Sequence, residues 1–120
     1  MKLSIAISAV LVSLVALFAS TATATAPVGR FVTLHLGPNV GEFRGAVKSD
    51  VLPCIANVKV RIVRVSGNDT RVGVGFTNGS GKFDIQTSES SGDWLAKVKR
   101  EQPKPGLTCA GAQSKIKSAG

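Results

Sequence analysis

Short segments in which apolar and polar residues alternate make up most of the chain from about residue 32 onward. Val32, Leu34 and Leu36 begin this period of two, which recurs in each later segment. Gly, Pro, Asn, Asp and Ser separate the segments at intervals of roughly ten residues, as in all-β domains. No segment of helical length carries an apolar stripe with a period of 3.6 residues. The pattern predicts an all-β chain of seven short strands arranged as a two-sheet β-sandwich.

The seven expected strands are defined by their apolar positions. They cover residues 32–36, 43–48, 58–62, 72–77, 83–85, 94–99 and about 112–118. The alternation slips between Ile62 and Val63, which predicts a β-bulge or the end of regular pairing there. The stretch Asn78 to Gly81 is the clearest hairpin signal, because its Asn-Gly pair suits a type I′ turn. Two prolines in the loop 102–106 exclude that loop from a central strand.

The inward positions of these strands define the expected core. It comprises Phe43, Val47, Val58, Val60, Ile62, Val74, Phe76, Phe83, Ile85, Trp94, Ala96, Val98 and Ile116. Trp94 could instead be a platform for stacking a sugar, but an inward Trp is favoured in a small sandwich. His35 has no carboxylate or thiolate near it in sequence, so a surface position is favoured over a metal ligand.

The N-terminal residues have a different character. Lys2 precedes an apolar run, Leu3–Ala19, and small residues follow it. This organisation predicts a cleaved secretory signal peptide over residues 1–24. A transmembrane anchor is the alternative, but the run of about 17 residues is at the lower limit for a bilayer and no basic cluster follows it. We therefore expect a single secreted domain over residues 25–120, with no membrane anchor after cleavage.

Two cysteines, Cys54 and Cys109, lie within the expected domain. In an exported chain they allow one intramolecular disulfide, whose loop of about 55 residues would contribute roughly 4 kcal/mol through loop-closure entropy. An intermolecular disulfide and a pair of reactive thiols are the alternatives. Neither residue belongs to a CxxC motif or has a His nearby, so a redox or nucleophilic role has no local support.

The composition limits the chemistry of the chain. Its 120 residues include 15 Lys and Arg against 7 Asp and Glu, for a formal net charge of +8. One His, two Cys and seven scattered carboxylates are too few for a multi-ligand metal centre or a conventional acid-base site. We therefore expect no catalytic residues, no metal and no cofactor.

Four segments carry a pattern that goes beyond strand alternation. They are Phe43-Arg44-Gly45-Ala46-Val47, Asn57-Val58-Lys59-Val60-Arg61-Ile62, Thr77-Asn78-Gly79-Ser80-Gly81-Lys82-Phe83 and Trp94-Leu95-Ala96-Lys97-Val98. Over about residues 42 to 100 this arrangement resembles the carboxypeptidase regulatory-like and transthyretin-like (prealbumin-like) domains of small secreted proteins. The resemblance implies a seven-stranded Ig-like, prealbumin-like sandwich that serves as a non-catalytic module. The cysteine placement resembles that of small secreted bacterial proteins.

The family's enzymatic properties do not transfer to this chain. The zinc site and catalytic Glu of the carboxypeptidases belong to another domain of those enzymes. The related hydroxyisourate hydrolases use a His-rich site and a Tyr-Arg-Gly-Ser-type C-terminus, and this sequence has neither.

Outward positions of three expected strands gather cations. These are Lys59, Arg61, Lys97, Lys99, Lys115 and Lys117. Side chains alternate across a strand, so all six face outward if their apolar neighbours face the core. The resemblance places the three strands in one sheet, with Arg71 and Arg100 at its margin. Such a face predicts binding of an extracellular polyanion or cell-envelope polymer, whereas the alternative is that these cations only keep the sandwich soluble.

The remaining expectations concern partners. Nucleic acid is the least favoured polyanion, because export argues against it and no aromatic side chain is expected on the face. The alternative function is a small secreted inhibitor or effector that binds one protein through the loop 87–93 or the loop 102–106. We expect a monomer. Glycosylation sequons at Asn68 and Asn78 lie in turns and matter only in a eukaryotic host.

Overall fold

The computed structural model describes residues 26–66 and 68–120, and the predicted signal peptide, residues 1–24, lies outside the described residues. The described part is all-β, with one turn of 3-10 helix at Leu52–Cys54. Its ten strands are β1 Phe31–Leu36, β2 Glu42–Lys48, β3 Lys59–Arg64, β4 Thr70–Phe76, β5 Lys82–Gln86, β6 Gly92–Val98, β7 Glu101–Lys104, β8 Leu107–Cys109, β9 Ala112–Gln113 and β10 Lys117–Ala119. Ten strands thus replace the seven expected ones. No helix in this part is long and apolar enough to cross a bilayer.

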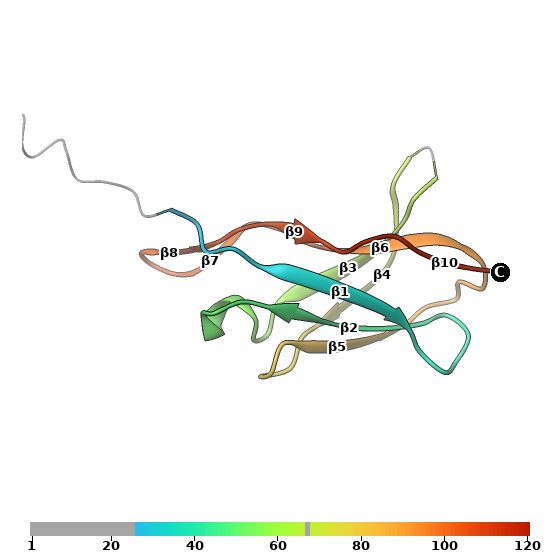
Figure 1. The fold of residues 1–120 in the computed structure, drawn as a ribbon, viewed down its shortest axis with the longest axis horizontal. Helices are drawn as coiled ribbons and strands as arrows, with labels where there is room; N and C mark the ends of the chain where they lie inside the picture. The colour runs from blue at the N-terminus through green and yellow to red at the C-terminus, as the bar shows by residue number, and fades with distance from the viewer. Residues whose placement is uncertain (1–25, 67) are drawn as a thin grey trace, which may run out of the picture.

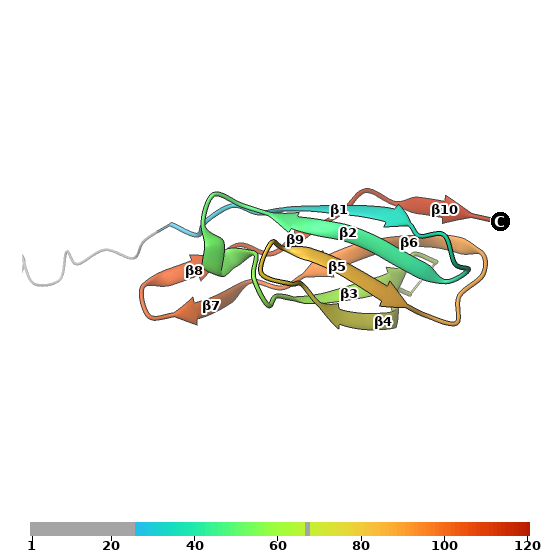
Figure 2. The ribbon, with the colours of Figure 1, turned by 90° about the horizontal axis from the view of Figure 1, so that it is seen from below.

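The strands form two antiparallel sheets that lie face to face, and a separate hairpin (Figures 1 and 2). The smaller sheet has the order β1-β2-β5. The larger sheet has the order β10-β6-β3-β4, and β9 also pairs with β6. The hairpin of β7 and β8 extends from one end of the sandwich (Figure 2). Residues 102–104, expected in a loop, thus belong to strand β7, but both prolines lie outside the two facing sheets, in line with the prediction that they exclude a central strand.

The core fills the space between the two sheets, as the alternation predicts. Ten of the thirteen expected core residues are buried: Phe43, Val47, Val58, Val60, Ile62, Phe83, Ile85, Trp94, Ala96 and Val98. Val32 and Leu34 of β1 join them. Phe43 and Trp94 meet edge to face, with ring centroids 5.0 Å apart. Trp94 is only 2% exposed, which confirms the inward reading of this residue.

The prediction was wrong for Val74 and Phe76 of β4, which face outward, while Gly73 and Gly75 face inward. Val74 is 37% and Phe76 58% exposed. Gly73 and Gly75 pair with the buried Ile62 and Val60 and so share their inward side. A Cβ at Gly75 would lie 2.6 Å from Cγ1 of Ile85 on the facing sheet. The facing sheet therefore leaves room only for glycine at positions 73 and 75, whereas Val72 packs against the core at the irregularity in the β3–β4 register.

The last expected strand is interrupted, and Ile116 is 52% exposed instead of buried. The break lies at Ser114, which separates β9 from β10. Ser114 donates its backbone N–H to the carbonyl of Ala96, and its Oγ accepts a hydrogen bond from the Ala96 N–H, each at 2.9 Å. A side chain thus replaces the backbone partner of β6, so regular pairing stops for three residues.

The structure confirms one local prediction and corrects another. The β3–β4 register shifts between Ile62 and Val63, where the alternation slips. The turn Asn78 to Gly81, in contrast, is not a hairpin turn, because it carries the chain from β4 in the larger sheet to β5 in the smaller one. Gly81 supplies its left-handed residue, with φ of 83°. Asn78 Oδ1 accepts hydrogen bonds from the N–H groups of Ser80 and Lys82.

The predicted disulfide is confirmed. Cys54 and Cys109 are joined with an S–S distance of 1.98 Å and Cα atoms 5.6 Å apart. Both residues are fully buried. The bond links the 3-10 turn to β8 and so fastens the β7–β8 hairpin to the sandwich.

Candidate functional site

The outer face of the larger sheet carries part of the predicted set of cations. Val60 and Ile62 of β3 point into the core, so Lys59 and Arg61 point outward. Arg61 lies opposite Lys97 of β6 in the register. Residues directly opposite each other in an antiparallel pair project on the same side of the sheet. Three of the six predicted cations thus share this face.

A shallow hollow of about 310 Å³ gathers cations at one end of this face. Its lining comprises Lys59, Arg61, Arg71, Lys99, Arg100 and Glu101; we call this site the basic hollow. Lys99 and Arg100 lie between β6 and β7, where the chain leaves the sheet for the hairpin. Arg71 comes from β4, and its register partner is Val63 of β3. The site therefore combines three predicted cations with the two arginines expected at the margin.

The carboxylate in the lining of the basic hollow pairs with Arg30 and not with any of the five cations. Within residues 26–66 and 68–120, none of them forms an ion pair. Glu101, the acidic residue of the lining, accepts a hydrogen bond from Arg30 Nη1 at 2.8 Å. Lys97 lies just outside the lining, and its Nζ atom is 3.6 Å from Oδ2 of Asp69. Unneutralised cations around one concavity produce a positive potential that attracts anions, and arginine forks suit carboxylate, sulfate and phosphate oxygens.

Buried Arg30 supports the basic hollow from behind. Its side chain is fully buried. It donates to the carbonyls of Lys99 at 2.6 Å, Ala110 at 2.7 Å and Cys54 at 3.2 Å, besides its contact with Glu101. One guanidinium thus fixes the backbone of Lys99 against the disulfide-bonded segment. Sequence reasoning missed this residue, because a lone Arg ahead of a strand carries no signal of its contacts.

The structure does not bring Lys115 and Lys117 to the basic hollow. Lys117 lies opposite Trp94 in the β10–β6 register, and Trp94 points into the core, so the two sides of the sheet separate Lys117 from Lys97. Both lysines instead line a hollow of about 340 Å³ beside β1, together with Ile116 and His35. The six cations therefore divide between two parts of the surface.

Exposed apolar side chains border the cations on the same outer face. Phe76 lies opposite Lys59 in the β4–β3 register, and Val74 lies opposite Arg61. The expectation that this face has no aromatic side chain is therefore wrong. It failed because Phe76 was expected in the core.

Three of the seven acidic residues, Glu42, Asp84 and Glu89, take part in two hydrogen-bonded groups away from the basic hollow. On the outer face of the smaller sheet, Arg44 Nε donates to Glu42 Oε2 at 2.8 Å and to Asp84 Oδ2 at 3.2 Å. Hydrogen bonding between the two carboxyls lowers the pKa of Glu42 and raises the pKa of Asp84. His35 lies opposite Arg44 in the register and is exposed, as expected. In the described part of the chain, no three His, Cys, Asp or Glu residues are placed to hold a metal ion.

The second group, around Glu89, ties the loop after β5 to the core. Glu89 Oε1 accepts hydrogen bonds from Trp94 Nε1 at 3.0 Å and from Arg64 Nε at 2.8 Å. The Trp94 hydrogen bond and the Arg64 charge hold the pKa of Glu89 below its ordinary value. Thr87 Oγ1 also donates to the carbonyl of Gly41 at 2.9 Å. Much of the loop 87–93, a candidate protein-binding loop, is thus fixed by intramolecular contacts.

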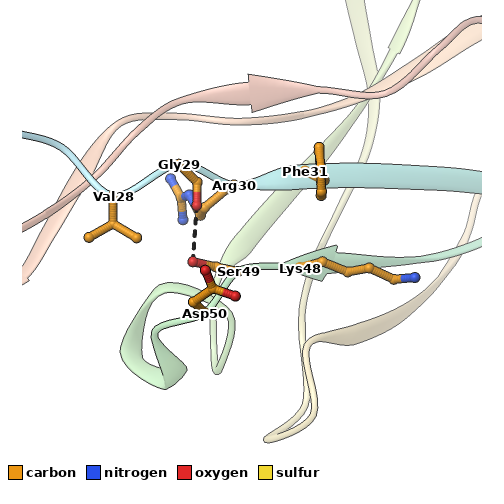
Figure 3. A pocket seen from close by; sticks show the side chains of 7 residues that line it. All are labelled: Val28, Gly29, Arg30, Phe31, Lys48, Ser49 and Asp50. Atoms are coloured by element: carbon orange, nitrogen blue, oxygen red, sulfur yellow. Dashed lines mark hydrogen bonds between the residues drawn. The ribbon is translucent and has the colours of Figure 1, made fainter.

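A larger hollow of about 460 Å³ lies where the chain enters β1 (Figure 3). Its lining comprises Val28, Gly29, Arg30, Phe31, Lys48, Ser49 and Asp50. Ser49 Oγ donates to the Gly29 carbonyl at 3.0 Å, and Lys48 runs away from Ser49 and Asp50 along β2 (Figure 3). The guanidinium of Arg30 donates its hydrogen bonds to backbone carbonyls and Glu101 and does not point into this hollow's opening as a free cation. The polar groups here therefore do not converge on a common point, in contrast to those of the basic hollow.

Comparison of the chain with protein-family models, with curated proteins and with solved structures finds no match in any of the three.

Proposed function

We propose that this chain is a secreted, non-enzymatic β-sandwich that binds an extracellular or cell-envelope polyanion through the basic hollow. The observation that carries the proposal is the convergence of five cations, unpaired among the described residues, on one concavity. Solubility alone requires dispersed charges and gives no reason for such convergence. The proposal includes the Ig-like, prealbumin-like class of sandwich and the transthyretin-like resemblance, which the two facing sheets support. The disulfide supports export, because such bonds persist in oxidising compartments.

The test compares two variants that lose the same charge. The first, Lys59→Gln/Arg61→Gln/Lys99→Gln/Arg100→Gln, removes four of the five cations of the basic hollow. The matched control, Lys48→Gln/Lys82→Gln/Lys115→Gln/Lys117→Gln, removes four exposed cations elsewhere. The measurement is retention of the oxidised domain, residues 25–120, on an immobilised acidic polysaccharide as the salt concentration rises.

We expect the unmodified domain and the control variant to stay bound at about 0.15 M salt, where the Debye length is about 8 Å. The variant of the basic hollow should elute well below that concentration, because the site keeps only one of its five cations, Arg71. Equal early elution of both variants would show that net charge, and not the hollow, causes retention. Early elution of the unmodified domain would refute polyanion binding.

The alternative function is binding of one protein partner through loops. The feature that favours it is the β7–β8 hairpin, which extends beyond the two sheets and exposes residues 102–106 (Figure 2). Substitutions at Gln102 and Lys104 would then abolish partner capture, whereas the hollow variant would still capture the partner.

A further inference from the structure

The exposed apolar pair on β4 has no structural role that accounts for it. Val74 and Phe76 point outward from an edge strand, which pairs only with β3 among the described strands. Outward positions of edge strands are ordinarily polar or charged, because this discourages association. The inner side of β4 is already filled by the contact of Gly73 and Gly75 with Ile85. The sandwich therefore gains no core contact from the two bulky side chains.

The arrangement of this pair along one strand, beside the basic hollow, distinguishes it from the other exposed apolar residues. The other exposed large apolar residues of the described chain do not occupy neighbouring outward positions of one strand, and isolated apolar residues are common on protein surfaces. They are Phe31, Leu36, Val40, Leu52 and Ile116. Val74 and Phe76, in contrast, occupy neighbouring outward positions of one strand. Each lies directly opposite a cation of the basic hollow, at the distance of a cross-strand pair, about 5 Å between Cβ atoms.

We propose that the polyanion bound by this face is the surface of an anionic lipid bilayer. In this arrangement the cations of the basic hollow contact phosphate headgroups, while Phe76 and Val74 enter the boundary between headgroups and acyl chains. The inference rests on the proposed function and specifies its ligand. Charge complementarity accounts for the cations, and an apolar layer beneath the headgroups accounts for the two neighbouring side chains.

A soluble polyanion fits the same face less completely. An acidic polysaccharide would satisfy the five cations but leaves Val74 without a reason to be exposed. Single-stranded nucleic acid could stack one base on Phe76, yet the aliphatic Val74 beside it offers no stacking surface. A lipid surface uses both side chains and the cations together.

The test uses a pair of matched aromatic variants, Phe76→Thr and Phe31→Thr. Both phenylalanines are exposed on strands, and Phe31 lies opposite a lysine, Lys48, as Phe76 lies opposite Lys59. Threonine preserves strand propensity, so both variants should fold. Their binding to vesicles of phosphatidylglycerol and phosphatidylcholine is measured by co-sedimentation, with pure phosphatidylcholine vesicles as the uncharged control. Their retention on the acidic polysaccharide is measured in parallel.

We expect the oxidised domain to bind the anionic vesicles and not the uncharged ones. Phe76→Thr should weaken vesicle binding about fivefold to tenfold, because it removes the burial of a largely exposed ring. The same variant should leave polysaccharide retention unchanged, and Phe31→Thr should change neither.

Other outcomes overturn the inference in distinguishable ways. If the domain binds the polysaccharide but not anionic vesicles, or if Phe76→Thr binds vesicles as well as the parent, the lipid assignment is wrong and polyanion binding stands. If Phe76→Thr instead weakens retention on immobilised oligo(dT) alone, the ring stacks on bases. If the parent binds neither vesicles nor polysaccharide, the inference and the proposed function fail together.

Discussion

Replacement of Arg30 by methionine should destabilise the fold more than any surface charge substitution. Methionine keeps much of the length of the arginine stem but removes the donors to the carbonyls of Lys99, Ala110 and Cys54 and to Glu101. The three carbonyls would lose a charged donor whose side chain is fully buried. Glu101 is 37% exposed and can be hydrated instead.

The expected cost follows from these contacts. A buried acceptor left without its partner costs about 1–3 kcal/mol, and truncation of one member of a buried ion pair costs about 3–5 kcal/mol. Since Glu101 regains water, we place the loss for Arg30→Met at about 3–4 kcal/mol. This is a large share of the roughly 5–15 kcal/mol that stabilises a typical domain.

The assay is urea denaturation of the oxidised domain, followed by the fluorescence of Trp94. The midpoint should fall while the slope of the free energy of unfolding against urea stays constant, because the surface exposed on unfolding does not change. Arg44→Met is the matched control, since Arg44 also forms ion pairs but is half exposed; its midpoint should hardly move. Arg30→Lys should recover part of the loss if Arg30→Met does not fold. A loss below about 1 kcal/mol for Arg30→Met would contradict the role assigned to these hydrogen bonds.

Two further predictions concern the disulfide and the acid limit of stability. The variant Cys54→Ser/Cys109→Ser should lose about 4 kcal/mol of unfolding free energy, because the bond spans 55 residues; an unchanged urea midpoint would contradict this. The pKa of Glu89 is lower in the folded chain than the ordinary 4.5, so its charge stabilises the fold above that pH and the contribution is lost as pH falls through the folded pKa. Glu89→Gln should therefore lower the melting temperature near neutral pH, and the difference from the parent should shrink below about pH 4. A difference that is independent of pH would rule out this linkage.

Strand existence and the register slip were predictable because they depend on local alternation. The slip between Ile62 and Val63 is visible as two successive apolar residues, and the structure has a register shift there. Which side chains of β4 face the core was not predictable in the same way. A sequence in which Val and Gly alternate fits either orientation, and the choice depends on Ile85, which lies in the other sheet.

In the candidate site, too, the local sequence predicts some side-chain positions, and others depend on contacts with residues far away in the sequence. The outward orientation of Lys59 and Arg61 was predictable from the buried residues that alternate with them. The orientation of Lys117 was not, because the hydrogen bonds of Ser114 interrupt the last strand and change the side to which later residues point. The turn Asn78 to Gly81 was also locally clear, yet a turn signal does not specify whether the next strand returns to the same sheet.

The disulfide also determines how the chain would respond to a pulling force. Cys54 and Cys109 close a covalent ring of 55 residue steps that contains β3 to β8, whereas β1, β2, β9 and β10 lie outside it. A load applied through the two ends would pass across the sulfur atoms and bypass the ring. Only the outer segments could then be drawn out to full length. The strands that carry most of the basic hollow would remain looped together while the tethered ends extend.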